Sequence, residues 1–342
     1  MGPTPMEKPG KLRNVRRVAS WMAAAPGAGT LREIVSRTPG SWLYHRPVLS
    51  WLSEAQLRAQ LPRAYRWFAL YCAMQSGDPV GAEPLLRLLI RHRERKGLDD
   101  RVPLRCEGST VVLDLHDPRF LRVPGELRGL SALMTHYLGA GDSFLDIGAN
   151  HGAYAVAAAA LLGSTGFVLA VEPQARLAHV VEQSLRAGPT PFEVHPVACG
   201  DAAREVELHV PLATSGSAGL FAAYSASAAH RTARVPMRPL DDIVDPDRLR
   251  GRVFMKLDVE GSEISVLRGA RRTIAATRPA ILCEVNAEAL AAAGASTDDL
   301  IATLRTLGYD RFATRERPGV ERPLDGAICE RDIIARHRGS EA

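Results

Sequence analysis

The sequence is poor in lysine, cysteine and aromatic residues, and each shortage excludes a class of protein or site. Its 342 residues include four lysines, so arginine carries almost all of the positive charge, as is typical of a GC-rich bacterial genome. The five cysteines are scattered, odd in number and without C-x-x-C spacing, which argues against a disulfide framework and a structural zinc site. Aromatic residues make up 6% of the chain, and no base-stacking surface for nucleic acid is recognisable. No apolar run approaches the ~20 residues of a membrane span, so we expect a cytoplasmic protein with no membrane partner.

The formal charge of +5 is distributed unevenly along the chain. Residues 1–142 hold 21 basic and 13 acidic residues, whereas the remainder is slightly acidic. Such an excess is typical of solvated helical faces, although it could also favour an anionic partner. We expect residues 1–40, rich in proline, glycine, serine and arginine, to be loosely ordered, and residues 41–103, where apolar residues recur three or four positions apart, to form a helical region.

The segment 144–152, Phe-Leu-Asp-Ile-Gly-Ala-Asn-His-Gly, is the most informative stretch of the chain. An apolar strand runs here into a glycine turn and then into an alanine-rich helix. Gly148 and Gly152 allow a tight turn and the close approach of a ligand, and the start of the helix offers unpaired N–H groups and a positive dipole end. Asp146, at the end of the strand, could bind an ammonium or a hydroxyl group. About twenty residues on, Glu172 ends a second apolar strand, where a carboxylate can bind a ribose diol.

Proteins that bind dinucleotides and proteins that bind S-adenosylmethionine share this pattern. The dinucleotide fingerprint G-x-G-x-x-G needs its middle glycine so that the pyrophosphate can touch the backbone, and Asn150 stands at that position here. An acid just before the turn, Asp146, also suits a cofactor with an amino group better than one with two phosphates. The sequence therefore favours S-adenosylmethionine over NAD.

Strands and helices alternate from about residue 104 onward, which predicts a mostly parallel sheet covered by helices on both faces. The expected strands are 111–115, 143–147, 167–171, 192–198, 252–257, 279–285 and 309–313, with an extra strand at 205–210 and a last, antiparallel strand at 327–334. The stretch 213–229 is rich in small residues and is expected to form a loop that covers a substrate or serves as a linker.

A second group of polar residues ends the fourth strand of the regular alternation. Residues 254–263, Phe-Met-Lys-Leu-Asp-Val-Glu-Gly-Ser-Glu, hold three acids and one of the four lysines. Ligands of open α/β sheets bind beyond the carboxyl ends of the strands, so we expect Asp258 and Glu260 to face the same crevice as Asp146 and Glu172. A general base belongs at this place.

Together these motifs resemble the FkbM-type S-adenosylmethionine-dependent methyltransferases. The matching segments occur in the family's order at 146–152, 171–173, 197–201, 239–242, 255–263 and 283–285. The resemblance covers about residues 104–335, leaves 336–342 as a tail, and implies a Rossmann-like class I methyltransferase sheet, mostly parallel with an antiparallel last strand, behind an extra helical N-terminal region. It also implies O-methylation of a hydroxyl on a small molecule, such as a sugar, a polyketide or another natural product, in bacterial secondary metabolism.

The resemblance further implies roles for individual residues. The residues expected to hold the methionine part of S-adenosylmethionine are Asp146, Gly148, Ala149, Asn150 and Gly152. Those expected to hold its adenosine are Glu172 and Pro173 at the ribose and Ala198 and Asp201 at the adenine. The expected catalytic residues are Asp258, which would orient or deprotonate the acceptor hydroxyl, and its neighbours Glu260, Lys256 and Glu284. His151, where a small apolar residue would be usual, could face this site, or it could lie at the surface or serve in packing.

Several alternatives stay open at this point. Asp258 and Glu260 could hold a divalent cation such as Mg²⁺, which would lower the pKa of the acceptor hydroxyl, in place of a direct proton transfer. A nucleic-acid methyltransferase could dock through the basic N-terminal region, but the low aromatic content and the missing N/D-P-P-Y-type strand end argue against it. An NAD-dependent oxidoreductase and a non-catalytic protein of the same fold are further alternatives. No pattern in the sequence indicates an oligomeric state.

Overall fold

The computed structural model describes residues 101–114, 117–211, 215–221, 230–324 and 331–339. The predicted segment 1–40 and nearly all of 41–103 lie outside these residues. The described strands of the main sheet are β3 (Ser143–Ile147), β4 (Phe167–Val171), β5 (Phe192–His195), β9 (Val253–Leu257), β10 (Ala280–Glu284), β11 (Tyr309–Thr314), β12 (Arg317–Pro323) and β13 (Asp332–His337). The described helices that flank them are α6 (Val123–Tyr137), α7 (Ala153–Leu162), α8 (Ala175–Arg186), α11 (Glu263–Arg268), α12 (Arg271–Thr277), α13 (Ala287–Ala292) and α14 (Thr297–Thr306).

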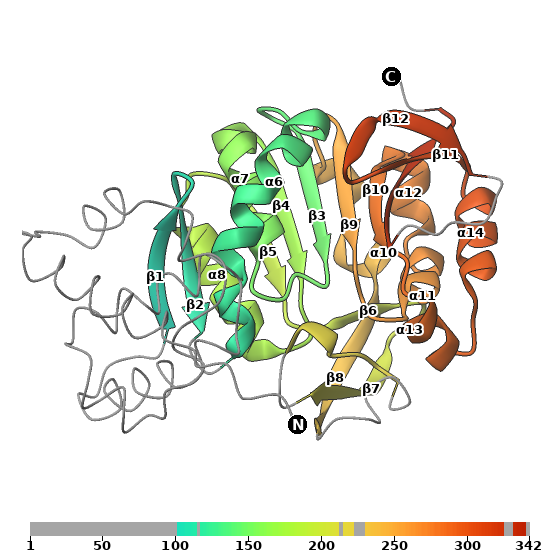
Figure 1. Cartoon of the computed structure of the whole chain (residues 1–342), viewed down its shortest axis with the longest axis horizontal. Helices are drawn as coiled ribbons and strands as arrows, with labels where there is room; N and C mark the ends of the chain where they lie inside the picture. Colours follow the sequence, from blue (N-terminus) through green and yellow to red (C-terminus); the bar gives the residue numbers. More distant parts are fainter. Residues whose placement is uncertain (1–100, 115–116, 212–214, 222–229, 325–330, 340–342) are drawn as a thin grey trace, which may run out of the picture. The chain divides into compact units, whose positions relative to one another are not determined.

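The main sheet has eight strands in the order β12-β11-β13-β10-β9-β3-β4-β5. The five strands from β10 to β5 are parallel, so their carboxyl ends meet at one edge, where their arrowheads lie in Figure 1. β13 runs antiparallel to β10 and to β11. The predicted α/β class, the mostly parallel sheet and the antiparallel last strand are therefore confirmed.

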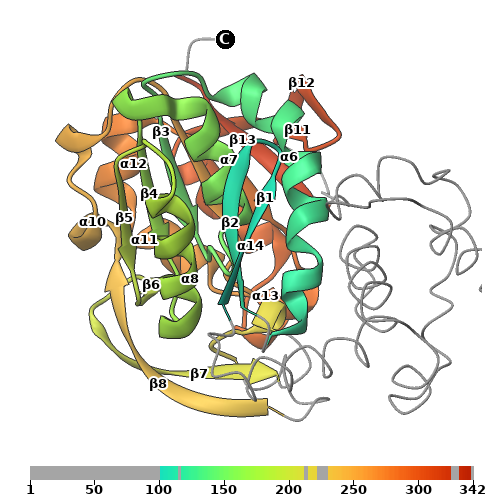
Figure 2. The same cartoon turned by 90° about the vertical axis from the view of Figure 1, so that its left-hand side faces the viewer.

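Helices cover both faces of this sheet, which Figure 2 shows from its side. Strands β3, β9 and β10 are buried at every position, as expected for parallel strands between two helical layers. Alternate residues of β3, such as Leu145 and Ile147, share a core with Ile264 of α11 and Leu300 of α14. The residues between them on β3 face the layer of α6, α7 and α8, so Asp146 points toward that layer.

A second, three-stranded sheet lies beside the carboxyl edge of the main one. It consists of β6 (Ala198–Gly200), β8 (His230–Pro239) and β7 (Arg204–Pro211), in that order. The predicted single strand 192–198 is therefore wrong at its end. Pro196 has no N–H to continue the ladder, and the N–H of Val197 turns back to the carbonyl of His195 at 2.9 Å, so Ala198 begins a strand of the second sheet.

Two further features extend the domain beyond the predicted limits of 104 and 335. A hairpin of β1 (Arg101–Cys106) and β2 (Ser109–Asp114) packs on α8, where the N–H of Val112 donates to the Ser184 hydroxyl at 2.8 Å. At the other end, β13 continues to His337. Among the described residues, no helix is long and apolar enough to cross a membrane.

Candidate functional site

A cavity lies beyond the carboxyl ends of β3, β4 and β9; together with the solvent space at its mouth it measures about 860 Å³. The residues predicted to bind the cofactor that line it are Gly148, Ala149, Asn150, Glu172, Pro173 and Ala198. The predicted catalytic residues that line it are Lys256, Asp258 and Glu260. The predicted residues that do not line it are Asp146, Gly152, Asp201 and Glu284. The structure thus brings the ends of three neighbouring strands to one cavity, as the strand-end motifs predicted.

The glycine turn after β3 is held by its close approach to β9. Gly148 has a φ of +83°, and a Cβ there would overlap the carbonyl oxygen of Asp258. Asn150 also adopts a left-handed conformation, with a φ of +51°, and its N–H donates to Glu172 Oε2 at 2.8 Å. The other oxygen of Glu172 accepts the N–H of Gln174 at 2.9 Å. Glu172 is 3% exposed, and this burial raises the pKa of its carboxyl group.

Asp146 lies beneath this turn, away from the cavity. Its Oδ2 accepts the N–H of Ala155 at 3.0 Å, in the first turn of α7, and its Oδ1 lies 3.6 Å from Lys256 Nζ. Burial raises the pKa of Asp146, and the charge of Lys256 opposes that rise. Asp146 therefore anchors α7 to the sheet and does not line the cavity.

Lys256 connects three parts of the site. Its Nζ donates to the carbonyl of Gly148 at 2.8 Å and lies 3.2 Å from Asp258 Oδ2, and its neighbour on β3 is Asp146. Burial alone would lower the pKa of Lys256, but the charges of Asp258 and Asp146 raise it. The lysine is consequently a cation that holds the ends of β3 and β9 together.

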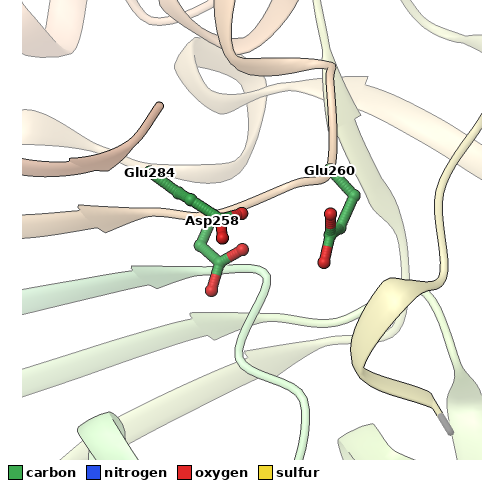
Figure 3. Close-up of side chains that lie close together, drawn as sticks. All are labelled: Asp258, Glu260 and Glu284. Carbon is green, nitrogen blue, oxygen red and sulfur yellow. The ribbon is translucent and has the colours of Figure 1, made fainter. Parts of the chain in front are cut away.

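Three carboxylates gather where β9 and β10 end, and Figure 3 shows those of Asp258 and Glu284 close together with that of Glu260 opposite them. One oxygen from each lies within 4.8 Å of the others. Glu284 Oε1 accepts hydrogen bonds from Arg331 Nε at 3.0 Å and Nη2 at 2.8 Å. Burial and the charges of Asp258 and Glu260 raise the pKa of Glu284 to about 8. Burial opposes the ionisation of Asp258, but Lys256 holds the pKa of this carboxyl below its usual value.

A short loop borders the cavity on another side. Residues 215–220 contribute Ser215, Gly216, Ala218, Gly219 and Leu220 to its lining, so this part of the predicted loop 213–229 borders the cavity. The Asn150 amide donates to the Ser215 hydroxyl at 3.0 Å. Residues 213, 214 and 222–229 of the predicted loop lie outside the described residues.

The same loop is tied to Asp117, a residue that the sequence does not mark as part of the site. Asp117 Oδ1 accepts the N–H of Ser215 at 3.4 Å and that of Arg119 at 3.0 Å, and Asp117 Oδ2 lies 3.2 Å from His151 Nε2. His151 is 2% exposed, so it is buried in the wall of the cavity. The Asp-Pro pair at 117–118 is a recognisable start signal for a helical turn, but its contacts with residues far along the chain leave no trace in the sequence.

Asp201, predicted to lie near the adenine, is placed on the surface. Its side chain is 39% exposed, and its Oδ1 accepts a hydrogen bond from Arg204 Nη1 at 2.8 Å. Ala198 and the neighbouring Cys199 line the cavity, whereas Asp201 does not. In this part of the site uncharged residues of β6 line the cavity.

Comparison with known proteins was made on sequence and on structure. Residues 146–311 match the sequence model of the methyltransferase FkbM domain. A methyltransferase FkbM from Methylobacillus flagellatus KT is similar at 20% identity, with 56% of this chain and 47% of that chain covered and a TM-score of 0.35. A SAM-dependent O-methyltransferase from Thermotoga maritima is similar at 12% identity, with 73% of this chain and 83% of that chain covered and a TM-score of 0.35.

This chain spans about half the length of the first of these two structures. No curated protein matches the chain. The six segments on which the resemblance was based all lie within the residues that match the family model. Residues 146–311 are therefore similar to the FkbM domain of methyltransferases.

Proposed function

We propose that this protein is an S-adenosylmethionine-dependent O-methyltransferase that acts on a hydroxyl group of a small molecule, such as a sugar, a polyketide or another natural product, in bacterial secondary metabolism. One observation carries the proposal: the glycine turn after β3, the acid after β4 and the acid after β9 border one cavity. Adenosine-containing ligands of α/β sheets bind at this place. The similarity of residues 146–311 to the FkbM methyltransferase domain supports methyl transfer as the reaction.

The residues at the cavity suit S-adenosylmethionine. Each oxygen of Glu172 accepts one backbone N–H and has a second lone pair, which suits a ribose diol. The turn from Gly148 to Asn150 brings backbone to the wall of the cavity next to that carboxylate. When bound, S-adenosylmethionine supplies a methyl group on a sulfonium, which is already a strong electrophile.

The chain itself then has to position the acceptor, exclude water and receive a proton. Asp258 is suited to hold the acceptor hydroxyl, because its side chain is 35% exposed and borders the cavity. Lys256 keeps this carboxylate oriented by its contact with Oδ2 at 3.2 Å. The loop 215–220 borders the cavity, where it would help to keep water from the reacting groups.

Calorimetric titration with S-adenosylhomocysteine tests the cofactor, with NAD as the comparison. We expect micromolar binding of S-adenosylhomocysteine and none of NAD. Binding of NAD, or of neither compound, would overturn the proposal.

Replacing Asp258 by alanine tests the acceptor side of the site. Because Asp258 lies at the cavity and Glu172 lies on the cofactor side, Asp258→Ala should keep S-adenosylhomocysteine binding and lose at least ~10² in turnover, a typical general-base contribution. Turnover is measured with an acceptor found in a screen of hydroxylated natural products. Near-normal turnover in this variant would remove Asp258 from the mechanism.

A further inference from the structure

Arg119 brings a positive charge to the wall of the cavity, and the proposed mechanism gives it no role. It belongs to the short 3₁₀ turn η2 (Pro118–Leu121), and its side chain is 26% exposed. Its Nη2 lies 3.2 Å from Oε1 of Glu126, an acid in the first turn of α6 that also lines the cavity. A guanidinium has several N–H donors, and Glu126 is the one ion-pair partner of Arg119 among the described residues. Donors of Arg119 therefore remain for a ligand.

Arg119 stands beside the glycine turn that follows β3. Its N–H donates to Asp117 Oδ1 at 3.0 Å, and Asp117 Oδ2 lies 3.2 Å from Nε2 of His151, a residue of that turn. The side chain of Arg119 also lies against the loop 215–220, because a Cβ on Gly216 would come within 2.7 Å of Arg119 Nη1. These contacts hold the guanidinium next to the residues that are assigned to the methionine part of the cofactor.

The cavity has more acidic than basic residues along its wall. Among the described residues that line it, the acids are Glu126, Glu172, Asp258 and Glu260, and the lysine and arginine are Lys256 and Arg119. Lys256 is already engaged, since its Nζ donates to the Gly148 carbonyl at 2.8 Å and lies 3.2 Å from Asp258 Oδ2. An excess of carboxylates favours the sulfonium and the ammonium of S-adenosylmethionine but repels its carboxylate. Arg119 is the cation at this wall that can compensate for that repulsion.

Arg119 is also within electrostatic reach of the acceptor side of the cavity. Burial opposes the ionisation of Asp258, and the charge of Lys256 and, to a smaller extent, that of Arg119 lower the pKa of this carboxyl group. The methionine part of the cofactor is joined to the sulfonium, which has to meet an acceptor held by Asp258, so its carboxylate belongs within a few bonds of this place.

We propose that Arg119 binds the carboxylate of the methionine part of S-adenosylmethionine, an inference that rests on the proposed function. A guanidinium and a carboxylate can form two parallel, charge-assisted hydrogen bonds, which fix the orientation of the ligand and neutralise its charge. Glu126 then serves to position the guanidinium through its ion pair with Nη2.

Calorimetric titration with two ligands tests this assignment without an activity assay. S-adenosylhomocysteine carries the amino-acid part, whereas methylthioadenosine keeps the adenosine and the thioether but lacks the ammonium and the carboxylate. We expect Arg119→Met and Arg119→Gln to bind S-adenosylhomocysteine at least about tenfold more weakly than wild type, the effect of one lost hydrogen bond to a charged group, and to bind methylthioadenosine with unchanged affinity. Arg122→Met is the matched control, because Arg122 is the next arginine along the chain, lies exposed and does not line the cavity. It should bind both ligands as wild type does.

The outcomes separate this inference from the proposed function. Weaker binding of S-adenosylhomocysteine alone, in the Arg119 variants and not in the control, supports the assignment. Equal weakening of both ligands overturns it, since Arg119 then shapes the cavity and does not bind the carboxylate. Unchanged binding of both ligands also overturns it and leaves the methyltransferase proposal standing, whereas a wild type that binds neither ligand defeats both proposals. Thermal denaturation identifies a variant that fails to fold, and the other Arg119 variant then decides.

Discussion

Replacing Asp117 by asparagine tests how the loop over the cavity is held. Asparagine can still accept the N–H groups of Arg119 and Ser215, but it has no negative charge to face His151. Burial tends to raise the pKa of Asp117, yet the hydrogen bond and charge of His151 and the bonds from Ser215 and Arg119 lower it to about 2. The side chain is 13% exposed, so solvent screens this interaction only weakly.

The stability that Asp117→Asn should lose follows from the difference between the pKa of Asp117 in the folded and in the unfolded chain. A fall of the Asp117 pKa from its ordinary value of 3.8 to about 2, at about 1.4 kcal/mol for each unit, corresponds to about 2 kcal/mol of stability for the ionised form. Because the folded pKa is the lower one, this stability is present above the unfolded pKa and is lost as the pH falls through the folded pKa. We therefore expect Asp117→Asn to be less stable than wild type by about 2 kcal/mol at pH 6, by about half that at pH 3, and by almost nothing below pH 2.

Urea unfolding of both proteins at several pH values between 6 and 2 measures the difference. Asp245→Asn is the matched control, because Asp245 also precedes a proline and caps a short 3₁₀ turn, through its bond to the N–H of Asp247 at 3.1 Å, but lies exposed. The Asp245→Asn substitution should change the free energy of unfolding only slightly, and by the same amount at every pH. A stability difference for Asp117→Asn that is absent at pH 6, or that stays constant down to pH 2, would refute the argument.

Two further substitutions test the junction of β3 and β9. Gly148→Ala should lose about 3 kcal/mol in urea unfolding, because of its φ of +83° and the overlap with the Asp258 carbonyl, whereas Gly108→Ala, with a φ of +80° and open space around it, should lose only about 1–2 kcal/mol. Equal losses in the two variants would contradict the close approach of the strands. Lys256→Met should cost about 3–5 kcal/mol, since it leaves Asp146 buried without its cation, and adding Asp146→Asn should restore part of that loss. An unfolding curve like that of wild type for Lys256→Met would show that the charge of Asp146 is balanced elsewhere.

The features predicted correctly from the sequence are those that depend on neighbours along the chain. Apolar runs of strand length, each followed by a helical pattern, predict a parallel sheet, and in such a sheet the strand ends necessarily meet at one edge. Glu172 and Asp258 were placed at the cavity on this basis alone, and both line it. A loop was also predicted over residues 213–229, which include 215–220, because a run of small polar residues between two strands is typical of a loop.

The features that were missed depend on contacts between distant segments. Arg331 pairs with Glu284 across 47 positions, and Asp117 bonds to Ser215 across 98. Neither pair has a periodic or spaced pattern that could be read in advance. The break at Pro196 was in principle readable, since proline cannot continue a ladder, but the apolar residues around it suggested one longer strand.

Asp146 shows why acidic residues near the end of a strand can take two different roles. Asp146 is the next-to-last residue of β3, paired in the sheet with Ala170 and Lys256, so the pleat directs its side chain under the α7 layer. Glu172 and Asp258 each follow the last residue of their strand, where the pleat no longer directs the side chain, and both border the cavity. A shift of one or two positions relative to the strand end therefore separates an acid that anchors a helix from one that can meet a ligand. Sequence patterns locate strand ends only to within a few residues, so this distinction requires the structure.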